Sequence, residues 1–426
     1  MDFENEVAGI SASITADDTA GALSHDDQIA ATIEVAEDQR EFDQGVSALE
    51  HLYASIESLI AVEESGEPIN ETTASLIAAP TTISTESVMQ NAMKTIKDFI
   101  DTCIRIGSDI VARIVRWAQN LKALLPSVLK SIATLRTTVD NLPATQKSAV
   151  HTNSAGLARL AVNNLIPRHS RHVLNGLSDI IKTATTIYGT YAPEILTLEQ
   201  KMNDVLEDSW GKNTGVDYLE EVNDVMTSQR IMTRKLFKFD KEEGDFTIGA
   251  SELLLGNKRV VSQWASLKAL AKFNEIDADS RPFEIAKILQ RSSVRLESTV
   301  TDDVLLVPKA ELFATMDKQE MILVLDACAG VLGIYDDFNN QISPKLKEQI
   351  ERSQRVLLKA QMAKDLPTKV DGTVAMTEAR YMKAIVSYHN SISKWASEPF
   401  SQFAAHILDI INACLRLIRV SVAQYE

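Results

Sequence analysis

One residue pattern in this sequence has a form that an endoprotease can recognise: a small residue, any residue, then glutamate. The small side chain would enter a tight pocket, and the carboxylate would pair with a basic group of the enzyme. Residues 1–86 contain the pattern five times, and the remaining 340 residues contain it three times. Ser84 and Glu86, followed by Ser87, lie in a polar linker, where cleavage requires no unfolding. The five copies end at Glu50, Glu57, Glu63, Glu67 and Glu86, and the other three end at Glu194, Glu252 and Glu398.

The charge of the chain changes sign at the same linker. Of the 59 acidic and 43 basic residues, residues 1–86 hold 19 acidic residues and a single basic one, Arg40, a net charge of −18. The rest of the chain sums to +2. Because a phosphate backbone attracts positive charge, we expect the first segment to repel nucleic acid and the remainder to tolerate contact with DNA. A solvated acidic tail that only aids solubility is the plainer alternative.

Two basic clusters are candidate phosphate contacts, Arg113 with Arg116 and Arg168 with Arg171. The first pair lies on a long amphipathic helix that we expect to begin at Ser87, and three aspartates interrupt its basic face. Such a helix packs into a bundle, lies on a membrane surface or contacts DNA, and packing is the ordinary role of its apolar stripe. The second pair lies in the stretch PRHSRH, for which a solvated basic turn is the simpler interpretation.

No other motif indicates an enzyme, a cofactor or a metal site. His169 and His172 have no adjacent cysteine or carboxylate, and the stretch GNKR lacks the glycine-rich run of a phosphate loop. The cysteines, Cys103, Cys328 and Cys414, each fall in an apolar helical pattern, so we expect buried, unpaired thiols in a reducing compartment. With no signal peptide and no run of about 18 uncharged apolar residues, we expect synthesis in a cytoplasm and no stable membrane insertion.

Apolar residues at helical spacing and sparse glycine predict a mainly α protein with long amphipathic helices. Two short apolar runs flank GNKR and predict a β-hairpin within residues 238–264, and residues 292–314 are similar in character. Three parts follow: an acidic segment 1–86, partly disordered with one amphipathic helix, a helical segment 87–142, and a helical domain 150–426 with a small β-sheet near 240–310. After residue 126, helices are expected at about 127–141, 170–187, 193–208, 215–236, 317–331, 343–363, 375–395 and 400–424.

Three stretches together resemble the internal head proteins of large tailed bacteriophages. They are the acidic block with EVAEDQREFDQGVSALEHLYASIESLI at 34–60, the linker with the helix at 86–125, and the C-terminal stretch at 388–426. The strand pair around FTIGASELLLGNKRVV is similar as well. The resemblance implies a structural protein that enters the procapsid with an acidic propeptide, which the phage prohead protease removes after a small-x-Glu site.

Carried onto this sequence, the resemblance places the cut after Glu86, with Ser84 as the small residue and Ser87 as the new N-terminus. Glu50, Glu57, Glu63 and Glu67 would be secondary cuts. The expected location is the capsid interior, reached from the host cytoplasm during assembly. The expected partners are the prohead protease, capsid or other internal head proteins, and packaged DNA through weak, sequence-independent contacts. Some members of the family are thought to leave the capsid with the genome.

Two other functions fit the same sequence. The chain could be a cytoplasmic helical scaffold whose acidic N-terminus stays attached and docks on a basic partner. It could also be an enzyme whose site is scattered through residues 150–426, which a deep cleft with convergent titratable groups would favour.

Overall fold

A computed structural model of the chain describes residues 125–144, 150–209, 236–299, 312–363 and 388–425, with short gaps at 153–156, 158, 274, 277–283, 286–287, 290, 390, 393 and 397. The acidic segment with its five small-x-Glu sites, the helix expected from Ser87 with Arg113 and Arg116, Cys103, and the helix expected at 215–236 lie outside the described residues.

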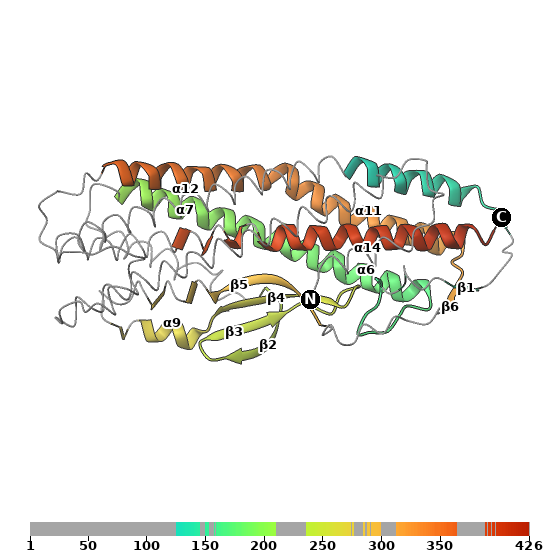
Figure 1. The fold of residues 1–426 in the computed structure, drawn as a ribbon, viewed down its shortest axis with the longest axis horizontal. Coiled ribbons are helices and arrows are strands. Elements are labelled where there is room, and N and C mark those ends of the chain that lie inside the picture. The colour runs from blue at the N-terminus through green and yellow to red at the C-terminus, as the bar shows by residue number, and fades with distance from the viewer. Residues whose placement is uncertain are drawn as a thin grey trace, which may run out of the picture.

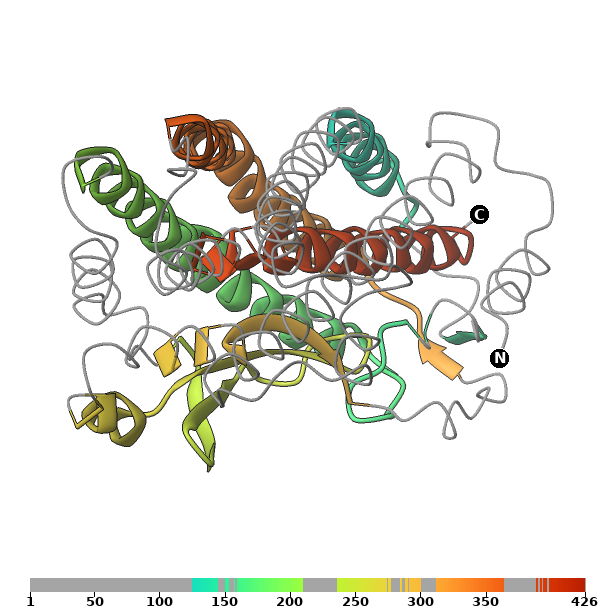
Figure 2. The ribbon, with the colours of Figure 1, turned by 60° about the vertical axis from the view of Figure 1, so that its left-hand side comes forward.

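Two long helical rods run side by side (Figures 1 and 2). They are parallel, because Ser170 contacts Glu320 near their N-terminal ends and Asn203 contacts Gln349 farther along both. The first rod consists of α6 (Ser170–Ala184), the π-helix η1 (Thr185–Tyr191) and α7 (Ala192–Ser209), and the second of α11 (Lys318–Gln341) and α12 (Ser343–Ala363).

Two further helical segments run antiparallel to these rods. Helix α14 (Glu398–Val422) begins beside η1, where the Tyr188 hydroxyl donates to the Phe400 carbonyl oxygen, and ends beside the start of α11. The helix at residues 125–140, drawn in teal in Figure 1, lies along α11 and is joined to it by an ion pair between Arg136 and Asp326. Apolar residues from all of these helices form one continuous core.

The centre of this core is aromatic. Tyr188, on the π-helix, packs against Tyr335, Phe338, Phe400 and Phe403, with ring centroids 4.8–6.1 Å apart. These rings come from the first rod, the second rod and α14, so one cluster joins all three. Large aromatic side chains bury more apolar surface than any others, which makes this cluster a main contributor to the packing of the bundle.

A four-stranded antiparallel sheet covers one side of the bundle (Figures 1 and 2). Trp264 from this sheet meets Trp395 edge to face, with ring centroids 5.1 Å apart, so one face of the sheet packs on the helices. The turn directly before Lys258 contains Gly256 at φ +78° and Asn257 at φ +55°, values that glycine and asparagine adopt most readily. The strand order follows the sequence: β2 (Lys238–Glu243), β3 (Phe246–Ala250), β4 (Lys258–Ala265) and β5 (Ser293–Ser298), with the short helix α9 (Leu267–Phe273) after β4.

The described residues are therefore mainly α-helical with a small β element, as the sequence predicts. The hairpin expected around GNKR is confirmed as β3 and β4. Of the strands near residues 292–314, β5 joins the four-stranded sheet, whereas β6 (Leu312–Ala314) pairs with β1 (Val150–Thr152) in a separate two-stranded ribbon. None of the described helices is both long enough and apolar enough to span a membrane.

Candidate functional site

The candidate phosphate contacts Arg168 and Arg171 lie together at the start of α6, and both side chains are exposed. The helix has no acidic residue in its first turn, and its N-cap, His169, makes no side-chain capping bond. Positive side chains and the positive end of a helix dipole both favour an anion. A carboxylate is already present, however, because the Ser170 hydroxyl donates to Glu320 at 2.5 Å. This end of α6 is therefore only mildly cationic, which suits weak contact with a phosphate backbone.

The three small-x-Glu patterns outside the acidic segment lie in or directly beside ordered elements. Glu194 is in the first turn of α7, and Glu398 is the first residue of α14. Glu252 follows β3, where the backbone N–H of Ser251 donates to the Val260 carbonyl oxygen at 2.9 Å and closes the ladder. A protease must draw its substrate into an extended strand, so each of these sites requires local unfolding before cleavage.

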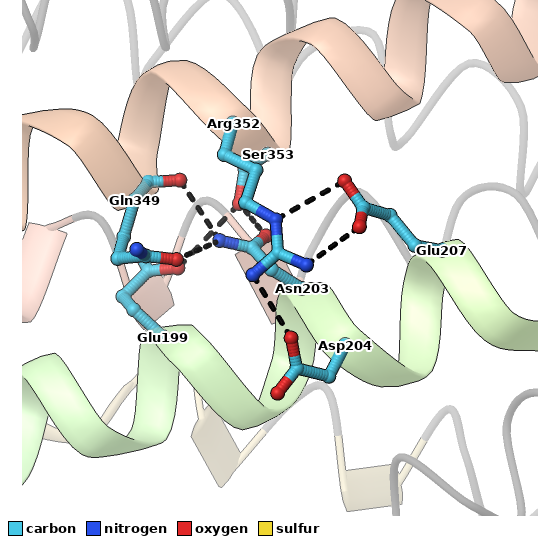
Figure 3. A network of polar contacts seen from close by, with 7 residues as sticks. All are labelled: Glu199, Asn203, Asp204, Glu207, Gln349, Arg352 and Ser353. Carbon is cyan, nitrogen blue, oxygen red and sulfur yellow. Dashed lines mark hydrogen bonds and ion pairs between the residues drawn. The ribbon is translucent and has the colours of Figure 1, made fainter.

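A buried polar network joins the two rods (Figure 3). Ser353 on α12 lies 2.5 Å from Asn203 Oδ1 and 3.5 Å from Glu199 Oε2, both on α7. Its hydroxyl also lies 3.2 Å from Nδ1 of His389. Asn203 Nδ2 donates to the Gln349 carbonyl oxygen at 2.9 Å and to its side-chain oxygen at 3.2 Å. All of these residues are at most 8% exposed.

The hydrogen bonds fix the direction of each donor in this network. Because Asn203 uses its amide N–H groups on Gln349, its Oδ1 faces Ser353 and accepts the serine proton. The serine oxygen is then left to accept from His389, which places the proton of the neutral imidazole on Nδ1. Burial lowers the pKa of His389 to about 4, so the ring is neutral at physiological pH.

This arrangement contains a serine, a histidine and a carboxylate, but its geometry is not that of a hydrolase triad. The histidine donates to the serine instead of removing its proton, and Glu199 lies next to the serine oxygen. Ser353, His389 and Glu199 are 3%, 2% and 0% exposed, so the hydroxyl is closed off from solvent. The network instead specifies the register of α7 against α12, since a shift of either helix would leave buried polar groups unpaired.

Arg352 extends the network to the surface (Figure 3). Its guanidinium pairs with Glu207 through two bonds of 3.1 and 2.5 Å and with Asp204 at 2.9 Å. The hydrogen bond to Glu207 is the main reason that the pKa of Arg352 is raised. Asp204 and Glu207 are largely open to solvent, so the ion pairs add little stability, but their two-pronged geometry supports the same register.

Sequence reasoning missed this network because its partners lie about 150 positions apart. One signal was present, since Glu199 with Asn203 and Gln349 with Ser353 are each polar pairs spaced four apart on otherwise apolar helix faces. Within the part of the chain that the structure describes, no group of three His, Cys, Asp or Glu side chains is arranged to hold a metal ion. No family model, curated protein or solved structure matches this chain.

Proposed function

We propose that this protein is a non-enzymatic structural component of the interior of a bacteriophage capsid. It is built into the procapsid with residues 1–86 as an acidic propeptide, which the phage prohead protease removes after Glu86. The mature part, residues 87–426, stays with the packaged DNA and can leave the capsid with it. The single observation that carries the proposal is the coincidence of a small-x-Glu site with the position at which the charge changes from −18 to +2.

Electrostatics supplies the reason for the processing. A polyanionic segment is compatible with an empty shell, but it repels the phosphates that fill the shell during packaging. Removing residues 1–86 takes away a net charge of −18 and leaves a nearly neutral protein. Exposed cations such as Arg168 and Arg171 then meet DNA without a competing acidic segment on the same chain.

The fold of the described residues supports the survival of the mature part during processing. Glu194, Glu252 and Glu398 lie in or beside ordered elements, so a protease that reads only three residues would have to unfold the chain locally to cut there.

Co-expression of the full chain with the cognate prohead protease tests the cleavage. We expect a product that begins at Ser87, and we expect Glu86→Gln to abolish it, because the substitution removes the carboxylate without changing the shape of the side chain. Glu194→Gln is the matched control, since it makes the same change in the first turn of α7 and should leave the product unaltered. Cleavage that is unaffected by Glu86→Gln would refute the proposed site.

A second experiment separates this function from that of a scaffold whose acidic segment stays attached. Binding of a duplex DNA of arbitrary sequence is measured by fluorescence anisotropy for the full chain and for residues 87–426 at several salt concentrations. The proposal predicts tighter binding by the shorter chain, with an affinity that falls as salt rises. Arg168→Gln with Arg171→Gln should reduce the salt slope, whereas Lys182→Gln, at the other end of α6, should not. Equal binding by the two chains would favour the scaffold.

A further inference from the structure

A leucine side chain is held out in solvent a few residues before α6. Leu165 is 72% exposed, the largest fraction among the exposed large hydrophobic residues that the structure describes. It closes a tight turn, in which the backbone N–H groups of Val162 and Leu165 donate to one another's carbonyl oxygens at 3.1 and 2.9 Å. Both central residues, Asn163 and Asn164, have positive φ, and the Asn164 N–H donates to the side chain of Asn257 at 2.9 Å. This is the pattern of a type I′ turn, anchored to the β-sheet side of the fold, so the turn itself keeps Leu165 exposed.

A second exposed leucine lies close to the first. Leu312 begins β6 and is 58% exposed, whereas the next residue, Phe313, is fully buried in the core. The backbone N–H of Ala314 donates to the Arg168 carbonyl oxygen at 2.9 Å, and this bond joins β6 to the segment that leads into α6. Leu312 is two residues from Ala314, and Leu165 is three residues from Arg168. The backbone of each leucine therefore lies within about 11 Å of its own member of the bonded pair.

Two exposed cations lie beside these leucines. Arg168 directly precedes the N-cap of α6, and Arg171 is in the first turn of that helix. The carboxylate of Glu320 is also at this end of α6, but it is half-buried and bonded to the Ser170 hydroxyl and to the backbone N–H of Asp317. The exposed side chains thus combine apolar and positive groups in one small area. We call them the leucine–arginine patch, which consists of Leu165, Arg168, Arg171 and Leu312.

The leucines decide which anionic partner the patch fits best. Arginine pairs with the phosphates of DNA and with those of lipid headgroups, so the cations alone fit either. A leucine side chain gains nothing from a phosphate, whereas its transfer from water into an apolar phase is favourable. Single exposed apolar residues are ordinary on protein surfaces, but two that are held beside two cations have the composition of a membrane-surface contact. We propose that the leucine–arginine patch docks on the surface of a bilayer that contains anionic lipids, with the arginines at the headgroup phosphates and the leucines at the acyl boundary.

Such docking would be peripheral and reversible. Two leucines bury far less apolar surface than a spanning helix, so binding needs both the leucines and the arginines. The attraction between the arginines and an anionic leaflet weakens as salt rises, because it falls off within a Debye length. Membrane docking by this patch does not require cleavage after Glu86, and it is distinct from the capsid function proposed above.

The test is co-sedimentation of the full chain with vesicles of phosphatidylcholine alone or of equal parts phosphatidylcholine and phosphatidylserine. Physiological salt screens the acidic residues 1–86, whose charge is the same in every variant. We expect the chain to sediment with the mixed vesicles and not with the neutral ones. Leu165→Asn combined with Leu312→Asn should weaken that binding roughly tenfold, because the apolar groups that leave water are gone. Arg168→Gln combined with Arg171→Gln should weaken it to a similar extent and should flatten its dependence on salt.

Leu129→Asn is the matched control, because Leu129 is 41% exposed on the helix at residues 125–140, which is separate from α6 and β6 (Figure 1). It should leave vesicle binding unchanged. Circular dichroism checks the fold of each variant, and Leu165→Asn alone keeps the test decisive should the leucine pair disturb the fold. Binding of duplex DNA separates the two anionic partners: the leucine pair should leave it unchanged, and the arginine pair should weaken it.

Three results would overturn the proposal. The first is that the parent chain does not sediment with the mixed vesicles. The second is that either the leucine pair or the arginine pair leaves vesicle binding unaltered. The third is that the leucine pair weakens DNA binding as much as vesicle binding, which would assign the patch to nucleic acid instead of lipid.

Discussion

Replacing Asn203 with leucine tests the claim that the buried network holds the two rods in register. The substitution roughly conserves volume, but it removes two donated hydrogen bonds to Gln349 and one accepted from Ser353. At about 1 kcal/mol net for each bond, the loss is about 3 kcal/mol, and a buried oxygen of Gln349 left unpaired adds about 1 kcal/mol or more. The buried leucine returns about 1–2 kcal/mol. The Ser353 hydroxyl can turn towards Glu199, 3.5 Å away, and recover part of its bond. The net cost should be about 2–3 kcal/mol.

The assay is guanidinium unfolding followed by circular dichroism at 222 nm, which reports the helices directly. The midpoint of Asn203→Leu should fall, with an unchanged slope if the unfolded state is unaltered. Gln200→Leu is the matched control, because it makes the same kind of change at an exposed position on the same helix and should alter stability by about 0.5 kcal/mol or less. Ser353→Ala, alone and combined with Asn203→Leu, completes a double-mutant cycle with an expected coupling of about 1 kcal/mol or more.

The reasoning fails if Asn203→Leu is as mild as Gln200→Leu, or if the effects of Asn203→Leu and Ser353→Ala simply add. Either result would mean that the hydrogen bonds between α7 and α12 add no stability beyond that of the packed side chains. The register of the rods would then have to come from the aromatic cluster around Tyr188 alone.

A glycine substitution tests the packing between α6 and the connection from β3 to β4. A Cβ at Gly176 would lie 2.4 Å from the Leu255 side chain, so Gly176→Ala should destabilise the fold by about 1–3 kcal/mol. Gly330 lies on an exposed face of α11 with open space around it, so Gly330→Ala should stabilise the fold by up to about 1 kcal/mol in the same thermal melts. Acid should weaken the fold through two buried histidines, because burial lowers the pKa of His389 to about 4 and that of His406 to about 3, so the unfolded chain binds more protons below about pH 6.5. This contribution to stability should be fully present above that pH and should decline by on the order of 1–2 kcal/mol per histidine down to pH 5. Unfolding curves measured from pH 7.5 to 5.5 give the slope of stability against pH, and His406→Phe should remove the share of that slope that His406 contributes. An unchanged slope would contradict this assignment.

The helices could be predicted from the sequence because their apolar stripes are wide and regular. The segments expected at 343–363 and 400–424 correspond closely to α12 and α14. Helix α11 continues to Gln341 instead of ending near residue 331. In that extension Tyr335 and Phe338 face the core, and the intervening aspartates are exposed, so the polar run that interrupts the sequence pattern is one helix face.

The join between α6 and α7 could not be predicted, because it depends on contacts with distant residues. Pro193 indicates a helix start in the sequence, since proline lacks the N–H group that a helix interior needs. The structure instead continues the rod through η1, where the Ala192 N–H donates to the Ile187 carbonyl oxygen five residues back. This wider turn lets Tyr188 and Tyr191 both face the core, and the hydroxyl of Tyr191 donates to the Trp395 carbonyl oxygen.

For the same physical reason, one part of the candidate site could be predicted from the sequence and the other could not. Arg168 and Arg171 are neighbours in sequence, so their joint exposure at the start of α6 follows from local pattern alone. The network of Glu199, Asn203 and Ser353 requires two helices to meet in one register, and periodicity shows which face of a helix is buried but not which residue it meets.

The most direct test of the proposed function is the identity of the N-terminal residue of this chain in purified phage particles. Mass spectrometry of virion proteins should find a chain that begins at Ser87 and should find no intact peptide across residues 80–95. A chain in mature particles that still carries residues 1–86 as its main form would contradict the account, because the acidic segment would then share the capsid interior with packaged DNA.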